Sequence, residues 1–356
     1  MAPGAAFAMS AAPAGGGRIA VIALTAGGRG LAARLAAALP GELIDPRPSG
    51  VLAAVALAWP RVDGLVLIMA CGVAVRAIAP LLRDKRLDPG VVVLDEAGRF
   101  CVSLLAGHLG GANDLARRLA GLTGGQAVIT TASDTLGHTA LDLWARRNAL
   151  FLAQGSLTAV SARLVSRGEL KVFIDLPGEL PEDFRAVAEA EGAELVVSNR
   201  RREPGAALAR LSPRNLALGI GCNRGVSGQR IEEAALAVCE ENGLDFQAVD
   251  GLGSIDIKRE EPGLWQFAAR HGLEITFYQA GELNSVPGLS PSSAARAATG
   301  AQGVAEPAAL LLAGDGGQLI VRKYKCKDVT IAIAARPVRL TANYPWSAPG
   351  QAATST

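Results

Sequence analysis

The segment Gly107-His108-Leu109-Gly110-Gly111-Ala112-Asn113-Asp114 separates two different hydrophobic patterns. The run before it, Phe100 to Leu105, is mostly apolar and predicts a buried β-strand. After it, Leu115, Leu119 and Leu122 are spaced as one face of an α-helix. A strand, a glycine-rich loop and a helix in this order are typical of an open α/β sheet, in which ligands bind beyond the carboxyl ends of the strands.

The composition of this loop points to an active site. Gly107, Gly110 and Gly111 permit positive φ angles and let the backbone come close to a ligand. The N–H groups at the start of the following helix can bind an anion. His108, one of only three histidines in the chain, can both give and take a proton near neutral pH. We therefore predict an anion-binding loop that contains a proton-transfer residue.

Strands and helices alternate through the rest of the chain as well. Further strands are predicted at 18–24, 64–69, 91–94 and 126–130, and a second set at 216–220, 273–278, 318–321 and 329–334. Between the two sets we expect a strand at 171–176, a helix at 181–191 and a strand at 194–197. The predicted fold is α/β: an open, mostly parallel Rossmann-like sheet in the N-terminal part, a small middle α/β segment, and a second, smaller α/β domain at the C-terminus.

The expected organisation follows from these elements. The first charge is Arg18, and Ala, Gly and Pro dominate before it. The predicted parts are a disordered extension at 1–17, an N-terminal α/β domain at 18–138, a middle segment at 139–212, a C-terminal α/β domain at 213–336 and a flexible tail at 337–356.

Composition excludes several classes of protein. The formal net charge is +2 and aromatic residues make up 4% of the chain, which argues against a nucleic-acid partner. No apolar run approaches the roughly 20 residues of a membrane-spanning helix. The five cysteines are scattered and odd in number, which argues against a disulfide framework and favours a cytoplasmic protein. Cysteine and histidine spacings also argue against a metal site held by the protein.

Two further patterns leave alternatives open. Gly219-x-Gly221-x-x-x-Gly225 has one residue too many for a dinucleotide-binding loop, although an anion could still bind at the helix start that follows. Basic residues cluster at two places, which are either solvated surfaces or clamps for a ligand with several carboxylates. These clusters are Arg76, Arg83, Lys85 and Arg86, and Arg322, Lys323, Lys325 and Lys327.

Taken together, the motifs and their order resemble the CbiG family, the cobalt-precorrin-5A hydrolases of anaerobic cobalamin biosynthesis. The resemblance runs from about Arg18 to Ala335 and is weak in the middle segment. In the N-terminal part it rests on Gly72 to Lys85, Asp88-Pro89, Val92 to Arg99, Ser103 to Asn113 and Thr130 to Asp134. In the C-terminal part it rests on Gly219 to Gly225, Asp256-Ile257-Lys258, Pro291-Ser292, Thr299-Gly300 and Gly303 to Glu306.

The resemblance implies a hydrolase whose substrate is a cobalt-bound, ring-contracted tetrapyrrole carrying a δ-lactone. Water would open the lactone formed from the ring A acetate, and the extruded meso carbon with its methyl group would leave as acetaldehyde. The product would be cobalt-precorrin-5B. No cofactor is implied, because the cobalt is carried by the substrate. The implied partners are this substrate and neighbouring cobalamin-pathway enzymes, with a homodimer left open and no nucleic acid or membrane.

Lactone hydrolysis needs a general base and donors for the developing oxyanion. His108 is the candidate base, and the N–H groups around Gly110 and Gly111 are the candidate donors. Asp134 would orient the histidine or take the proton itself. Glu306 is a second candidate acid or base, and a helix cap is the competing interpretation. The expected substrate-binding residues are Gly72, Arg76, Arg83, Lys85, Gly107, Gly110, Gly111, Asn113, Gly221, Cys222, Asn223, Arg224, Lys258, Lys323 and Lys325.

Two alternatives belong to other functional classes. A non-catalytic carrier of a cobalt tetrapyrrole would use the same residues, with His108 as a cobalt ligand. A nucleotide-dependent enzyme is disfavoured by the glycine spacing. Release of acetaldehyde separates the hydrolase from the carrier, and nucleotide binding tests the third class.

Overall fold

The computed structural model describes residues 18–39, 41–84, 87–201, 207–287 and 293–342, which belong to two structural units, 1–143 and 144–356. The extension predicted at 1–17 lies outside the described residues, as do Lys85, Arg86 and residues 343–356.

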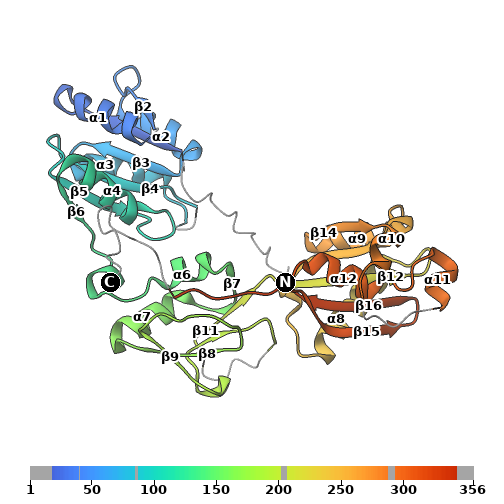
Figure 1. Ribbon diagram of the computed structural model, residues 1–356. Helices are drawn as coiled ribbons and strands as arrows, with labels where there is room; N and C mark the ends of the chain where they lie inside the picture. Colours follow the sequence, from blue (N-terminus) through green and yellow to red (C-terminus); the bar gives the residue numbers. More distant parts are fainter. Residues whose placement is uncertain (1–17, 40, 85–86, 202–206, 288–292, 343–356) are drawn as a thin grey trace, which may run out of the picture. The chain divides into compact units, whose positions relative to one another are not determined.

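The first unit contains a six-stranded sheet in the order β2-β1-β3-β4-β5-β6 (Figure 1). Its strands are β1 (Ile19–Ala23), β2 (Glu42–Ile44), β3 (Gly64–Ile68), β4 (Gly90–Leu94), β5 (Phe100–Leu105) and β6 (Gln126–Val128). The β4–β5 pair is antiparallel, and the other four pairs of the sheet are parallel. The prediction of an open, mostly parallel α/β sheet is therefore confirmed.

Helices cover both faces of this sheet. Leucines of α1 (Ala26–Ala38) and α4 (Ala112–Thr123) pack on one face, against Val21 and Val66. Alanines of α2 (Val51–Ala58) and α3 (Cys71–Ile78) pack on the other face. Such a two-sided cover explains why β3 and β4 are buried at every position and read as continuous apolar runs.

The antiparallel β4–β5 hairpin decides which loops can meet. Its turn is closed by the N–H of Gly98, which donates to the carbonyl of Asp95, and Gly98 has a φ of 68°. Because β5 runs opposite to β4, the carboxyl ends of β5 and β6 lie at one edge of the sheet. The carboxyl ends of β1, β3 and β4 lie at the other edge.

The second unit contains two five-stranded sheets. The middle sheet has the order β7-β11-β10-β8-β9, and α7 (Leu157–Arg167) precedes β8. Its strands are β7 (Leu150–Gly155), β8 (Leu170–Ile174), β9 (Phe184–Ala186), β10 (Leu195–Val197) and β11 (Ala209–Pro213). The helix predicted at 181–191 is wrong, because 184–186 pairs in parallel with β8 and buries Phe184.

The C-terminal sheet has the order β14-β13-β12-β16-β15. Its strands are β12 (Leu216–Cys222), β13 (Val249–Ile255), β14 (Glu274–Tyr278), β15 (Gln318–Cys326) and β16 (Val329–Ala335). On one face lie α8 (Gly228–Glu241) and α9 (Pro262–His271), and α12 (Ala305–Ala313) lies on the other. Two shorter helices, α10 (Ala280–Asn284) and α11 (Ser293–Thr299), precede α12. The predicted second α/β region is therefore present.

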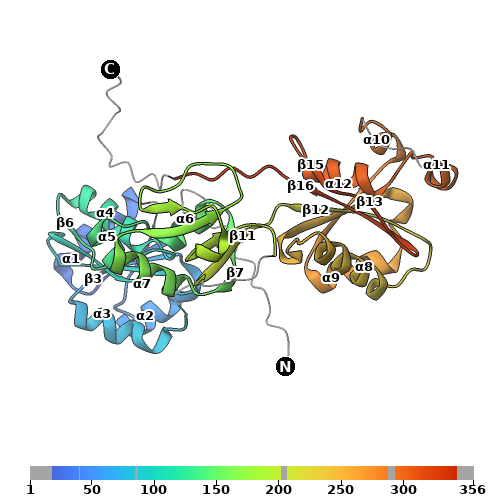
Figure 2. The same cartoon turned by 90° about the horizontal axis from the view of Figure 1, so that it is seen from below.

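The start of the predicted flexible tail is held in place instead. Leu340 is only 1% exposed, and its backbone exchanges hydrogen bonds with Pro177 and Glu179 at 2.9 and 3.0 Å. The carbonyl of Thr341 accepts a 3.0 Å hydrogen bond from the indole N–H of Trp144. Figure 2 shows the segment after β16 returning along the middle sheet. Tertiary contacts therefore order residues 337–342, which composition alone does not predict.

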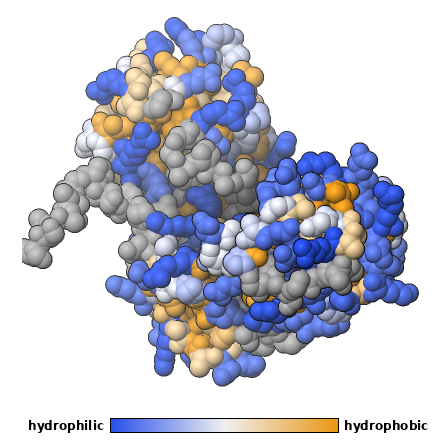
Figure 3. Space-filling view, turned by 45° about the vertical axis from the view of Figure 1, so that its right-hand side comes forward, coloured by the Kyte–Doolittle hydropathy of each residue, from blue (hydrophilic) through white to orange (hydrophobic). Residues whose placement is uncertain are grey.

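Hydrophilic residues cover much of the visible face in the space-filling view, and hydrophobic residues form scattered groups (Figure 3). Within the described ranges, no helix has both the length and the apolar character that a bilayer crossing requires.

Candidate active site

His108 lies between two carboxylates in the first unit. Its Nε2 is 2.8 Å from Oδ2 of Asp134, and its Nδ1 is 3.2 Å from Oδ1 of Asp142. The hydrogen bonds with Asp134 and then Asp142 raise the pKa of His108 to about 9, against the opposing effect of burial. The side chain, 17% exposed, is therefore an imidazolium at neutral pH, with both ring nitrogens engaged as donors.

The sheet brings these residues together. β5 and β6 are parallel neighbours, so the segments that follow them leave from the same edge. His108 follows β5, while Asp134 lies in the first turn of α5 (Ala132–Leu136), which follows β6. Asp134 also accepts a hydrogen bond from Arg117 of α4. Although burial raises the pKa of Asp134, the bonds from His108 and Arg117 leave it below its usual value.

Some N–H groups of the glycine loop are bonded within the loop itself. The N–H of Gly111 donates to the carbonyl of His108 at 2.9 Å, and the N–H of Asn113 donates to Gly107 at 2.9 Å. The loop therefore does not present Gly111 as a free donor for an oxyanion. Gly110 has a packing role, because a Cβ at this position would lie 2.5 Å from Cβ and 2.9 Å from the carbonyl oxygen of Ala106.

Asn113 is a buried connector in this network. Its Oδ1 accepts a 2.6 Å hydrogen bond from Ser103, and its Nδ2 donates to Asp134 at 2.9 Å and to Thr131 at 3.2 Å. These contacts tie β5 to α4 and α5. Since the amide is already bonded within the protein, Asn113 supports the loop rather than offering a contact to substrate.

The other expected N-terminal residues do not join this network. Gly72 is in the first turn of α3, at the opposite edge of the sheet, and Arg76 lies one turn further along that helix. The backbone N–H of Arg83 donates to the carboxylate of Asp88 at 3.2 Å. Gly72 and Arg76, which the sequence also offered for substrate binding, therefore lie apart from the Gly107 loop, because the β4–β5 hairpin reverses the chain direction.

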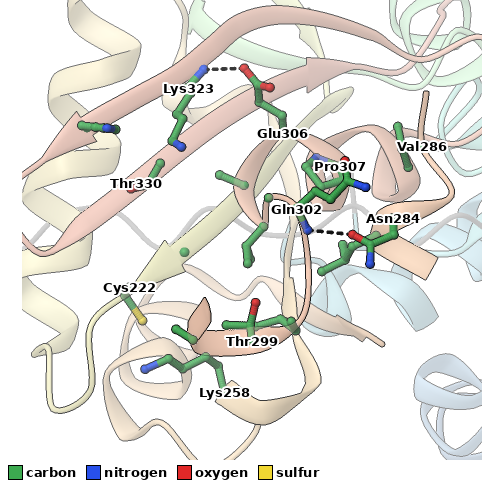
Figure 4. Close-up of a pocket in the computed structure, with 18 of the residues that line it drawn as sticks. Cys222, Lys258, Asn284, Val286, Thr299, Gln302, Glu306, Pro307, Lys323 and Thr330 are labelled. Atoms are coloured by element: carbon green, nitrogen blue, oxygen red, sulfur yellow. Dashed lines mark hydrogen bonds between the residues drawn. The ribbon is translucent and has the colours of Figure 1, made fainter. Parts of the chain in front are cut away.

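A second candidate site is a cavity of about 480 Å³ in the C-terminal sheet region (Figure 4). It lies where β12 and β13 end and where α12 begins. Seven of the residues expected from the sequence line it: Gly221, Cys222, Asn223, Lys258, Glu306, Lys323 and Lys325. Arg224 is not part of this lining.

Glu306 is the buried acid of this cavity, with 8% exposure. It lies in the first turn of α12, where the positive end of the helix dipole favours a negative charge. Its Oε1 accepts a 2.9 Å hydrogen bond from the backbone N–H of Lys323 on β15, drawn as a dashed line in Figure 4. The carboxylate is therefore fixed between a helix and a strand.

Positive side chains line the same cavity. Lys323 and Lys325 are exposed and alternate along β15, and Lys327 follows at the hairpin turn. Lys258 also lines the cavity but is paired with Glu261 at 3.1 Å. The exposed lysines can bind carboxylates of a ligand by charge-assisted hydrogen bonds.

Cys222 and Asn223 have other roles. Burial raises the pKa of the Cys222 thiol to about 11, so this thiol is neutral at pH 7 and is a poor nucleophile. Asn223 donates a 2.8 Å hydrogen bond from Nδ2 to Asp328 and fixes the turn between β15 and β16. Both residues shape the wall of the cavity.

The glycines of 219–225 serve packing. A Cβ on Gly219 would lie 1.8 Å from the carbonyl oxygen of Ala305, so glycine is required where α12 crosses β12. The start of α8 already has partners, since Ser227 caps Arg230 and Glu261 accepts from the N–H of Gly225 at 2.6 Å. The anion site expected at this helix start is filled by the protein's own carboxylate.

Sequence reasoning missed several members of both sites. Asp142 and Arg117 complete the surroundings of His108, but neither belongs to a recognisable local motif. Asn284 accepts a 2.7 Å hydrogen bond from the N–H of Gln302 and shapes the loop before α12. Among the described residues, no group of three or more His, Cys, Asp or Glu side chains is arranged to hold a metal ion.

Comparisons with known proteins match both ends of the chain. The family models for Cobalamin synthesis G N-terminal and Cobalamin synthesis G C-terminus match residues 53–134 and 216–334. A protein of Salmonella typhimurium named cobalt-precorrin-5A hydrolase is 34% identical over 345 residues, which cover 88% of this chain and 97% of the relative. A protein of the same name from Priestia megaterium is 36% identical over 296 residues, covering 77% and 79% respectively. The crystal structure of CobE, from the cobalamin pathway, covers 34% of this chain and 89% of its own, at 37% identity and a TM-score of 0.33.

Proposed function

The chain belongs to the cobalamin synthesis G (CbiG) family, and from this membership we propose that it is an enzyme of cobalamin biosynthesis that hydrolyses cobalt-precorrin-5A. One observation carries the proposal: the similarity to the Salmonella hydrolase extends over 97% of that relative's length. Both family models match within this one chain, the N-terminal model at 53–134 and the C-terminal model at 216–334.

The proposed reaction opens the δ-lactone of the substrate with water and then releases a two-carbon fragment as acetaldehyde. The product is cobalt-precorrin-5B. The chemistry requires a base and groups that bind carboxylates, but no organic cofactor, and the cobalt arrives with the substrate. The cavity that contains Glu306, Lys323 and Lys325 supports this proposal, because it combines a fixed carboxylate with exposed positive charges.

The test is an aldehyde-coupled assay with authentic cobalt-precorrin-5A under anaerobic conditions. We expect acetaldehyde and a product shortened by two carbons, in equal amounts. Folded protein that binds the substrate but releases no acetaldehyde would favour a tetrapyrrole carrier instead. His108 does not favour that alternative, because an imidazolium with both nitrogens engaged has no lone pair for cobalt.

A further inference from the structure

We propose that one atom, Oε2 of Glu306, takes the proton in both steps of the reaction, opening of the lactone and release of acetaldehyde. This inference rests on the proposed function and deepens it by assigning the base. His108, Asp134 and Glu306 were the residues that the sequence offered for this role. Asp134 already pairs with His108 and Arg117, and the structure also distinguishes His108 from Glu306.

The hydrogen bonding of Glu306 leaves one oxygen for chemistry. Oε1 is held by the N–H of Lys323, whereas no residue in the described part of the chain donates a hydrogen bond to Oε2. The side chain is more than nine-tenths buried and lines the cavity. In Figure 4 it extends from α12 toward the strand that carries Lys323. A carboxylate fixed at one oxygen and unpaired at the other is suited to general-base catalysis.

The other titratable groups fit this role less well. His108 is protonated and cannot accept a proton at neutral pH. Within the lining of the cavity, Asp328 is the other carboxylate, but it is exposed and accepts a hydrogen bond from Asn223. Lys258 is ion-paired with Glu261. Glu306, in contrast, is hydrogen-bonded to the backbone of β15, the strand that carries Lys323 and Lys325.

The first step balances with a single carboxylate. Oε2 takes a proton from water while the water oxygen bonds to the lactone carbonyl carbon. The adduct then collapses and breaks the bond between this carbon and the ring oxygen. The protonated Glu306 returns its proton to that oxygen, which leaves a carboxylic acid and a secondary alcohol.

The second step uses the regenerated carboxylate. Oε2 removes the proton of the new hydroxyl group, whose electron pair forms the carbonyl of acetaldehyde. The carbon–carbon bond to the macrocycle breaks, and its electron pair enters the conjugated ring system. Glu306 then gives the proton to the macrocycle, so that no oxidant or reductant is needed.

Glu306→Gln tests the assignment, because the amide oxygen can still accept from the N–H of Lys323 but cannot take a proton. We expect acetaldehyde release to fall about 100-fold or more, while the affinity for cobalt-precorrin-5A and the melting temperature stay near the wild-type values. The matched control is Glu233→Gln, on the exposed side of α8 and outside the cavity, which should leave activity unchanged.

Glu306→Ala with added formate supplies a second readout. A small carboxylate that occupies the vacated space should restore part of the acetaldehyde release, whereas a purely structural role would not be rescued. Near-normal turnover by Glu306→Gln overturns the assignment. Loss of substrate binding in both variants without formate rescue also overturns it, in favour of a positioning role. A silent wild-type protein defeats the proposed function itself, and this inference with it.

Discussion

His108 carries a positive charge at neutral pH because Asp134 and Asp142 bind both of its ring nitrogens. A histidine in a glycine-rich loop has the composition of a catalytic base, but its protonation state depends on residues that follow β6. The network around it joins the loop after β5 to α4, α5 and α6 (Leu141–Arg147). At this scale the main role that the contacts support for His108 is stabilisation of the loop.

We predict that His108→Gln changes the pH dependence of stability. The pKa of His108 is raised from 6.5 to about 9 on folding. The contribution of protonated His108 to the free energy of unfolding is therefore complete below about pH 6.5 and is lost as the pH rises through about 9. This contribution is on the order of 2 kcal/mol. Urea unfolding of the wild type should show this loss, and the variant should show a flatter profile across the same window. Asp142→Asn should reduce the loss only in part. Equal slopes in wild type and His108→Gln would contradict the pairing.

At the scale of the element, β15 has two different faces. Tyr324 and Cys326 pack on the core beneath α8, whereas Lys323 and Lys325 line the cavity on the side of α12. The period-two alternation of a strand therefore separates core residues from binding residues. On β12, Gly219 lacks a Cβ, which lets α12 pack closely against this strand. This close packing sets the position of Glu306 over the sheet.

The alternation predicts the effect of the double variant Lys323→Ala and Lys325→Ala. It should weaken substrate binding, since charge-assisted bonds to carboxylates are lost. The free energy of unfolding should change little, because exposed charges contribute about 0–1 kcal/mol each. The loss of affinity, measured by titration, should shrink at high salt, where attraction is already screened. Arg322→Ala, on the same strand but outside the cavity lining, is the control. Unchanged affinity of the double variant at low salt would assign Lys323 and Lys325 to a solvated edge.

On the largest scale, residues 337–342 pack back onto the middle sheet of the second unit. After β16, the chain returns to the middle sheet, where Leu340 is buried and Thr341 bonds with Trp144 and Asn148. Residues more than 190 positions apart, such as Asn148 and Thr341, are therefore adjacent. This contact links the middle segment of the chain to the residues that follow β16.

Two truncations test this link. Removal of 337–356 should lower the free energy of unfolding by on the order of 3 kcal/mol, because a buried leucine is lost and the polar groups of Trp144 and Asn148 lose partners. Removal of 343–356 alone keeps these contacts, so the difference in stability between the two truncations measures the contribution of 337–342. Thermal unfolding measures both, and equal melting temperatures for the two truncations would show that the anchor contributes nothing.

Local patterns in the amino-acid sequence were sufficient to predict most strands, the helix after the Gly107 loop, and the family motifs at both ends of the chain. These features depend on neighbouring residues, so a local pattern is sufficient to predict them. The segment 181–191 was predicted wrongly because its pairing with β8 outweighs its local helical pattern.

Only the tertiary structure decided the chemistry of the candidate residues. The charge of His108 depends on Asp134 and Asp142, which lie 26 and 34 positions away and reach it because β5 and β6 are parallel neighbours. The separation of Gly72 from the Gly107 loop depends on the direction of one strand pair. Glu306 has one oxygen bonded to β15, and within the described ranges the other oxygen has no donor, because β15 passes α12 at Lys323. Strand direction, burial and hydrogen-bond partners arise from contacts between distant segments, and therefore no local pattern in the sequence contains them.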